Sequence, residues 1–296
     1  MPDDSSNPTI HISVLPDETI DSLRLRRGAV VLDGTLGGGG HTRRIAEIVG
    51  GQGLVVALDR EPDAISRCEI ALKGMPIILA QSNFADAPEI LKQLDVPSVD
   101  AALLDLGLSS DQLEDSQRGF SFRSDGPLDL RFDKHSGEPA YRLIQRMKQV
   151  HLANLIYQYG EERLSRRIAR KLVRLRDQQE LRTAKQIADA IYGCYPNPKQ
   201  QKIHPATRTF QALRIAVNDE LRSLEIALNR LPDCIRPGGI LSIISFHSLE
   251  DRRVKQAFRD DPRLEPINRK PIVAGEEELA VNPRSRSAKL RFAKRL

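Results

Sequence analysis

Aromatic residues, cysteines and paired histidines are scarce in this 296-residue sequence. Phe, Tyr and Trp make up 4% of it, with no Trp, so a surface dense in rings for stacking bases is not evident. The three cysteines, Cys68, Cys194 and Cys234, form no C-x-x-C pair, which argues against a disulfide framework and a thiolate metal site. The six histidines never pair at ligand spacing, so we expect no bound metal.

The sequence also lacks the signals of a membrane or secreted protein. No apolar run approaches the roughly 20 residues that cross a bilayer. Residues 1–9, M-P-D-D-S-S-N-P-T, are acidic and polar, unlike a secretory signal. We therefore expect a cytoplasmic protein with no membrane partner, and its length allows two structural units.

Basic charge is concentrated in two segments. Residues 141–214 hold 16 Lys and Arg against 5 Asp and Glu, and residues 282–296 hold 6 basic residues and no acid. Because the whole chain has a net charge of +5, the remainder carries −12. A chain that is acidic in one part and strongly basic in an inner segment and a tail indicates a polyanionic partner.

A glycine cluster, D-G-T-L-G-G-G-G-H-T from Asp33 to Thr42, lies between an apolar run at 29–32 and a helical pattern. A strand, a glycine turn and a helix in this order let the backbone approach a nucleotide-like ligand, because no Cβ intervenes. A second acid, Asp59, ends the next apolar run 20 residues after Gly39. That is the interval at which a second-strand carboxylate meets ribose hydroxyls.

The spacing D-x-x-x-G-x-G, with Asp33, Gly37 and Gly39, resembles the first motif of class I S-adenosylmethionine methyltransferases. A dinucleotide site would instead show G-x-G-x-x-G with a phosphate on the helix N-terminus. Thr35 stands where the generic motif has its middle glycine. The alternative is a glycine-rich surface loop, which the strand before it and the helix after it disfavour.

Apolar runs alternate with helical patterns along the first hundred residues, as is typical of a parallel α/β sheet. The alternation stops after residue 105, where a loop-like stretch and then only helical patterns follow, and it resumes near residue 212. We predict strands at 29–33, 53–59, 77–80, 101–105, 240–244 and 288–294, and helices at 41–49, 62–73, 86–94, 212–231 and 248–259. Residues 106–136 and 260–285 are predicted to be irregular.

This pattern predicts one α/β domain with an all-helical insertion between its fourth and fifth strands. The α/β domain comprises residues 1–112 and 212–296, and the insertion comprises residues 113–211. Because this insertion carries much of the excess basic charge, we expect it to contact the polyanionic partner.

Asp105 ends the fourth strand, beside the glycine loop, where ligands of open α/β sheets bind. Its carboxylate could accept hydrogen bonds from a cofactor or a substrate amine, or merely cap the following turn. Phe84 could pack on an adenine face or in the core. His41 follows the glycines, where a structural role and a binding role are both open, and Gln112 could supply a polar contact.

Five arginines lie at helical spacing in a helix predicted from Glu161 to Arg176, opposite a buried stripe of Leu and Ile. Guanidinium groups pair well with phosphate oxygens, so the stripe favours nucleic-acid contact. The alternative is a solvated face tied by local pairs such as Glu162 with Arg166. The arginines are Arg163, Arg166, Arg167, Arg170 and Arg174.

His247 and Ser248 follow the predicted fifth strand and could line a substrate pocket. No acid lies at triad spacing and no G-x-S-x-G elbow exists, which excludes the usual hydrolase patterns. Ser248, followed by Glu250, could equally cap the next helix.

Long segments of the sequence resemble the RsmH (MraW) family, bacterial 16S ribosomal RNA cytosine-N4 methyltransferases. They are D-G-T-L-G-G-G-G-H at 33–41, L-D-R-E-P at 58–62, L-L-D-L-G-L-S-S-D-Q-L at 103–113, R-G-F-S-F-R-S-D-G-P-L-D-L-R at 118–131, Y-G-E-E-R at 159–163, H-P-A-T-R-T-F-Q-A-L-R at 204–214, S-F-H-S-L-E-D-R at 245–252 and the N-P-R-S-R-S tail. The match covers nearly the whole chain in one order.

The resemblance implies a Rossmann-like class I fold, S-adenosyl-L-methionine as cofactor and 16S rRNA within the small ribosomal subunit as partner. The reaction would methylate the exocyclic N4 of a cytidine in the decoding region, with Asp105 directing the amine. Cofactor contacts would fall on Gly39, Gly40, His41, Asp59, Phe84, Asp105 and Gln112. His204, Arg208, His247 and Ser248 join the five arginines as candidate RNA contacts.

One feature departs from other amino-directed nucleic-acid methyltransferases. These typically show D/N-P-P-Y/F after the fourth strand, where this chain has Asp105-Leu106-Gly107-Leu108. The second acceptor and the ring that stacks on the base are therefore not identified from the sequence.

Two other function classes are weighed against this one. A nicotinamide-dependent dehydrogenase shares the strand and glycine turn but needs G-x-G-x-x-G. A non-catalytic RNA-binding module needs the arginines but neither Gly39 nor Asp59. The sequence leaves both a monomer and a homodimer open.

Overall fold

The computed structural model describes residues 13–178 and 180–296, which form two compact units. Arg222–Leu296 and the described residues up to Ser110 make the first unit, and Asp111–Leu221 makes the second. No helix within these described ranges is long and apolar enough to cross a membrane.

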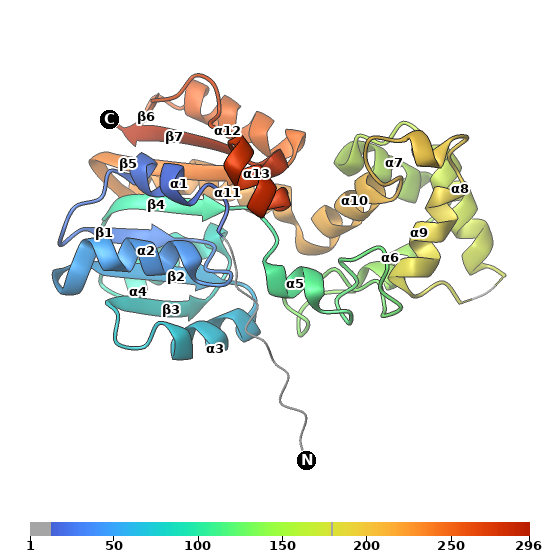
Figure 1. Ribbon diagram of the computed structural model, residues 1–296, viewed down its shortest axis with the longest axis horizontal. Coiled ribbons are helices and arrows are strands. Elements are labelled where there is room, and N and C mark those ends of the chain that lie inside the picture. Colours follow the sequence, from blue (N-terminus) through green and yellow to red (C-terminus); the bar gives the residue numbers. More distant parts are fainter. Residues whose placement is uncertain (1–12, 179) are drawn as a thin grey trace, which may run out of the picture. The chain divides into compact units, whose positions relative to one another are not determined.

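The first unit is built on a seven-stranded sheet in the order β3-β2-β1-β4-β5-β7-β6 (Figure 1). The first five strands in this order are parallel, and β7 pairs antiparallel with both β5 and β6. The strands are β1 (Val30–Asp33), β2 (Leu54–Asp59), β3 (Ile77–Gln81), β4 (Val99–Asp105), β5 (Ile235–Ser245), β6 (Leu264–Pro266) and β7 (Lys289–Arg295).

Helices cover both faces of this sheet, because its central strands are apolar on both sides. Leu32 of β1 faces a core that includes Leu91 and Leu231, whereas Val31 faces a second core that includes Ile45. The helices of this unit are α1 (Pro16–Leu23), α2 (Gly40–Val49), α3 (Pro62–Ala71), α4 (Ala87–Gln93), α11 (Glu220–Cys234), α12 (Ser248–Asp260) and α13 (Glu276–Val281), with η1 (Gly50–Gln52), η2 (Phe84–Asp86) and η4 (Pro283–Ser287). The predicted α/β class is confirmed.

The second unit is helical, and it joins β4 to β5 as predicted. Its elements are α6 (Ala140–Arg146), α7 (Gln149–Gly160), α8 (Ser165–Arg176), α9 (Ala184–Tyr192), η3 (Pro198–Gln200) and α10 (Thr207–Asn218), and α5 (Ser110–Glu114) leads into it.

Several predicted boundaries are wrong. The single helix predicted at 212–231 is two helices, α10 and α11, because Asp219 adopts a left-handed conformation (φ 52°) that ends α10. The stretch 260–285 is not irregular throughout, since it contains β6 and α13. Both are too short for a periodic pattern to reveal them.

Buried polar groups order the loop between α5 and α6. Arg118 is buried and donates to the carbonyl oxygens of Arg131 and Phe132 at 3.0 and 2.9 Å. The Asn218 side chain donates to Leu130 O at 2.7 Å and accepts from Phe132 N at 2.8 Å. These bonds hold Leu130 in a left-handed conformation (φ 64°), so this loop is a fixed part of the second unit.

Candidate active site

Three carboxylates lie at the carboxyl ends of adjacent parallel strands. Asp33 ends β1, Asp59 ends β2 and Asp105 ends β4. Strand β1 lies between the other two, with Asp33 in register with Ala57 of β2 and Leu103 of β4. The edge of the sheet that binds ligands in open α/β folds is therefore acidic in this chain.

Asp33 is fully buried and anchors the start of α2. One carboxylate oxygen, Oδ2, accepts a 2.6 Å hydrogen bond from the Thr42 hydroxyl, and the other, Oδ1, accepts a 3.0 Å bond from the Thr35 backbone N–H. Burial raises the pKa of the Asp33 carboxyl, and these hydrogen bonds offset only part of that effect. The sequence reasoning did not identify Thr42, although a Thr in the first turn after a glycine loop is a recognisable signal.

Thr35 joins β1 to β4. Its hydroxyl accepts a 2.6 Å hydrogen bond from the backbone N–H of Asp105 and lies 3.4 Å from Asp33 Oδ1. A glycine at this position could make neither contact. The departure of Thr35 from the generic motif thus has a structural reason, since its side chain fixes the position of Asp105 relative to Asp33.

The glycine loop folds back onto the end of β2. Gly37 and Gly39 have φ angles of 51° and 78°, which glycine adopts without strain. The Gly37 N–H donates to Asp59 Oδ2 at 2.8 Å, and Gly40 is the first residue of α2. The loop therefore connects the strand-end acid of β2 to the N-terminus of α2.

Asp59 has bonding capacity left for a ligand. Its Oδ2 accepts from Gly37 and its Oδ1 accepts a 2.9 Å bond from the Glu61 N–H. A carboxylate has about four lone-pair sites, so this carboxylate can accept a further hydroxyl hydrogen. Burial raises the pKa of Asp59, and backbone hydrogen bonds from Glu61, Gly37 and Arg60 oppose that rise.

His41 and Asp105 face each other with bonding positions unfilled. His41 Nε2 lies 3.5 Å from Asp105 Oδ2, and neither ring nitrogen of this buried histidine has a hydrogen-bond partner among the described residues. Asp105 Oδ1 accepts a 3.0 Å bond from the Gly107 N–H. A buried imidazole without a partner costs free energy unless a ligand supplies one. This donor set fits the charged amino-acid end of a cofactor such as S-adenosylmethionine.

The other two predicted cofactor residues lie on separate elements. Phe84 begins η2 after β3 and is half-buried at the edge of the core, so the sequence alternatives of core packing and ring contact both persist. Gln112 is a buried residue of α5 and belongs to the second unit.

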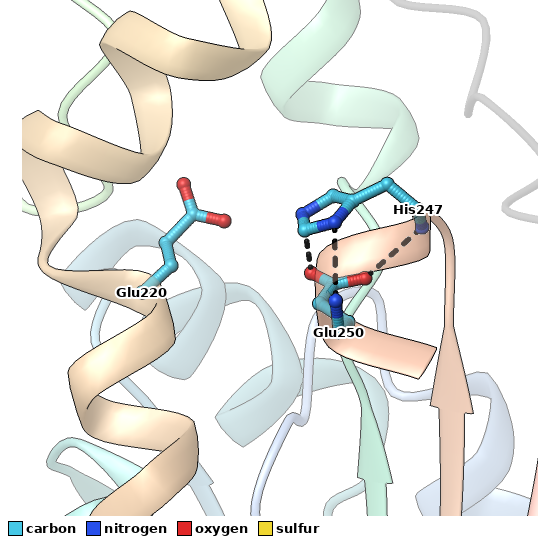
Figure 2. A group of neighbouring side chains, drawn as sticks. All are labelled: Glu220, His247 and Glu250. Atoms are coloured by element: carbon cyan, nitrogen blue, oxygen red, sulfur yellow. Dashed lines mark hydrogen bonds and ion pairs between the residues drawn. The ribbon is translucent and has the colours of Figure 1, made fainter. Parts of the chain in front are cut away.

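His247 is the N-cap of α12 and lies beside Glu250 (Figure 2). Ser248 is the first residue of this helix. The His247 Nδ1 accepts from the Glu250 N–H at 3.3 Å, and Glu250 Oε2 accepts from the backbone N–H of Phe246 at 2.8 Å. The suggestion that Ser248 caps this helix is therefore wrong, because His247 does so. This cap fixes the chain just beyond the end of β5.

All five arginines of the predicted stripe are exposed, and none forms an ion pair with a carboxylate within the described ranges. The helix begins at Ser165, so Arg163 precedes α8 and is not part of it. The suggested Glu162–Arg166 pair does not form, because Glu162 is buried and accepts from Tyr195 Oη at 2.6 Å and from Leu164 N at 2.7 Å. The stripe is thus an exposed cationic surface of the second unit.

His204 and Arg208 belong to the same unit, before and within α10. The His204 ring stacks on Phe122, with ring centroids 4.6 Å apart, and its Nδ1 accepts from Ala206 N at 3.2 Å. Arg208 is exposed and donates to the carbonyl oxygen of Glu161 at 3.4 Å.

A strand-end acid, a glycine turn onto a helix and a second acid at the end of β2 fit a Rossmann-like methyltransferase of class I, and the family match identifies this class. A sequence profile of the MraW methylase family matches residues 8–296, and the chain belongs to this family. Its cofactor is S-adenosylmethionine.

Three relatives are close over their whole lengths, and each is named ribosomal RNA small subunit methyltransferase H. The protein of Rhodopirellula baltica is 47% identical over 99% of this chain and 93% of its own length. The protein of Prochlorococcus marinus is 48% identical over 100% of this chain and 97% of its own length. The protein of Deinococcus deserti is 45% identical over 100% of this chain and 97% of its own length.

The space at Gly34 yields a testable prediction about the loop. A Cβ there would lie 2.4 Å from Leu104 Cδ2 and 2.9 Å from Phe84 Cβ, whereas a Cβ on Gly51 would meet nothing within 4 Å. Neither glycine has a left-handed φ, so only space distinguishes them. We expect Gly34→Ala to lower the free energy of unfolding by about 1–3 kcal/mol and Gly51→Ala to change it by less than about 0.5 kcal/mol. Denaturant titration measures the free energy of unfolding of both variants. Equal losses of stability would contradict the inference that a side chain at position 34 collides with Leu104 and Phe84.

The burial of Asp33 predicts a pH dependence. Its pKa is above 3.8 in the folded chain, so the folded state retains the proton to higher pH than the unfolded state does. The stabilisation of wild type relative to Asp33→Asn is therefore greatest at low pH. It should fall as pH rises through the folded pKa, by at most about 1.4 kcal/mol per pH unit.

Denaturant unfolding of both proteins between about pH 4 and about pH 8 measures this difference. Asp63→Asn, at an exposed position of α3, is the control for loss of a carboxylate. A wild-type advantage that grows with pH would show that Asp33 is stabilised in its charged form.

Proposed function

We propose that the protein transfers a methyl group from S-adenosylmethionine to the exocyclic N4 of a cytidine in the decoding region of 16S rRNA. The observation that supports this most directly is family membership over residues 8–296, with relatives named small-subunit rRNA methyltransferases. The substrate would place the reaction in the cytoplasm, on the small ribosomal subunit or its rRNA.

The cofactor would lie along the carboxyl ends of β1, β2 and β4. Asp59 would accept hydrogen bonds from the ribose hydroxyls, and Phe84 would contact the adenine. Gly39 and Gly40 would let the backbone approach closely, and His41 with Asp105 would hold the amino-acid end. Gln112 would complete the set. Bound there, the cofactor supplies an electrophilic sulfonium methyl.

Asp105 would direct the nucleophile. The N4 amine of cytosine is delocalised into its ring and attacks weakly, so alignment and exclusion of water carry most of the rate. Asp105 Oδ2 has no hydrogen bond to it from the described chain, and it could accept an N4–H and aim the amine. No strong base is needed, because the methylated amine cation loses its proton readily.

RNA recognition is assigned to the helical insertion, residues 113–211 of the predicted division. The exposed arginines of α8, together with Arg163, His204 and Arg208, would contact phosphates and neighbouring nucleotides. His247 and Ser248 would lie near the target base because the N-terminus of α12, where both residues lie, follows the end of β5. The target cytidine must be unstacked before it can enter a pocket at the sheet edge.

Methyl transfer from labelled S-adenosylmethionine tests the function. The substrates are small-subunit particles and naked 16S rRNA from cells that lack this gene, and the nucleosides are digested and separated. Label in N4-methylcytidine supports the proposal, and mapping it identifies the cytidine. Label in another nucleoside would overturn the N4 assignment while leaving the methyltransferase class intact.

Asp105→Asn tests the assigned role of this carboxylate. Because Gly107 N–H binds Oδ1, the amide would place its NH₂ at the Oδ2 position, where it would oppose an N4–H. We expect kcat at saturating cofactor and RNA to fall about 100-fold or more. Asp86→Asn, at an exposed position of η2, is the matched control. An unchanged kcat would remove Asp105 from the mechanism.

The cationic surface predicts a change in salt dependence. We expect the combined Arg166→Ala, Arg170→Ala and Arg174→Ala variant to bind RNA more weakly and to reduce the slope of log affinity against log salt by about 2 to 3. Filter binding at several salt concentrations measures this slope. The control replaces three exposed lysines of the first unit, Lys73, Lys92 and Lys255, by alanine. Equal slopes for the two triple variants would contradict a role specific to α8.

A further inference from the structure

The chain segment after Asp105 contains no aromatic residue, yet a ring lies beside it from another strand. Phe246 follows the last residue of β5, and β5 pairs with β4 so that Asp105 is opposite Ile244. The Leu106 N–H donates to Ile244 O at 3.0 Å, which keeps the two chains together past the strand ends. Asp105 and Phe246 therefore leave the sheet at the same edge.

Gly107 brings the carboxylate and the ring into contact with one backbone segment. A Cβ on Gly107 would lie 2.8 Å from both Cε2 and Cζ of Phe246 and 3.1 Å from Asp105 Oδ1. The Gly107 N–H also donates to that same oxygen. Any other residue at 107 would push the ring and the carboxylate apart, so glycine is required here for space, not for a left-handed φ.

Phe246 is held in place without being fully enclosed. Its backbone N–H donates to the buried Glu250, and its side chain packs at the edge of a cluster formed by Val14, Leu15, Ile244, Ala288 and Leu290. The residue is only half-buried, unlike the other apolar residues at the end of β5. A fixed, partly open ring next to a carboxylate is a suitable arrangement for holding a planar base.

We propose that Phe246 is the ring on which the target cytosine stacks while Asp105 accepts its N4–H. This rests on the proposed function and identifies the group that the D/N-P-P-Y/F pattern would otherwise supply. Stacking fixes the plane of the base, and the N4–H bonds lie in that plane. The attacking lone pair develops perpendicular to it, so a ring on one face leaves the opposite face for methyl transfer.

Phe246→Leu separates stacking from packing. Leucine keeps an apolar side chain against the cluster but removes the π face, and Phe246→Tyr restores a ring. Phe292→Leu is the matched control, because Phe292 is also half-buried and packs at the edge of the same cluster, on β7. Denaturant unfolding of all three variants records any loss of stability.

A double-mutant cycle between protein and RNA measures the contact without requiring methyl transfer. Two RNAs are compared, one with the mapped target cytidine and one with an abasic site in its place. We expect wild type, Phe246→Tyr and Phe292→Leu to bind the intact RNA about 5- to 150-fold more tightly than the abasic one. Phe246→Leu should lose most of this preference. Its kcat/KM for RNA should fall, whereas its affinity for S-adenosylmethionine should not change.

Two outcomes would overturn the assignment, and they differ from failure of the proposed function. If Phe246→Leu keeps the full preference for the intact RNA, the ring does not hold the base. If Phe246→Leu and Phe292→Leu lose equal preference, the effect is one of packing. Failure of wild type to methylate a cytidine in the labelling experiment would instead reject the function on which the inference rests.

Discussion

The arrangement of the active site depends on one buried carboxylate, Asp33. It receives the Thr42 hydroxyl from the first turn of α2 and the Thr35 N–H from the loop before it. Thr35 in turn accepts the N–H of Asp105. Burying an acid raises its pKa and costs stability unless its lone pairs are filled, so this site trades stability for a fixed geometry.

Ligand-binding capacity lies at the unfilled positions around that fixed frame. Asp59 keeps a lone pair after accepting from backbone N–H groups, and His41 has two ring nitrogens without hydrogen-bond partners among the described residues. Phe246 adds a partly open ring beside Asp105. Acceptors, an imidazole and a ring on rigid strand ends suit a reaction whose rate comes from alignment rather than from a strong base.

Acidic and basic groups gather at different places in the two units. The first presents acidic groups at its strand ends, whereas α8 of the second presents arginines that no carboxylate of the described chain neutralises. Glu162, the partner suggested for Arg166, instead accepts a hydrogen bond from Tyr195. This contact explains why the suggested Glu162–Arg166 pair does not form. A buried hydrogen bond such as that between Glu162 and Tyr195 depends on which segments the fold packs together.

The sequence by itself determined the α/β class, the strand-end positions of Asp33, Asp59 and Asp105, the helical insertion and the family, because glycine turns, short apolar runs and long motifs are local signals. Only the tertiary structure decided that Thr35 bridges two strands, that Asp219 breaks a long helical pattern, that His247 rather than Ser248 caps α12, and that Phe246 lies against Gly107. The contacts of Thr35 with Asp105 and of Gly107 with Phe246 join segments far apart in the sequence, which no local pattern encodes. The turn at Asp219 and the cap at His247 are local, but several residues there could have served, and the folded backbone selected one of them.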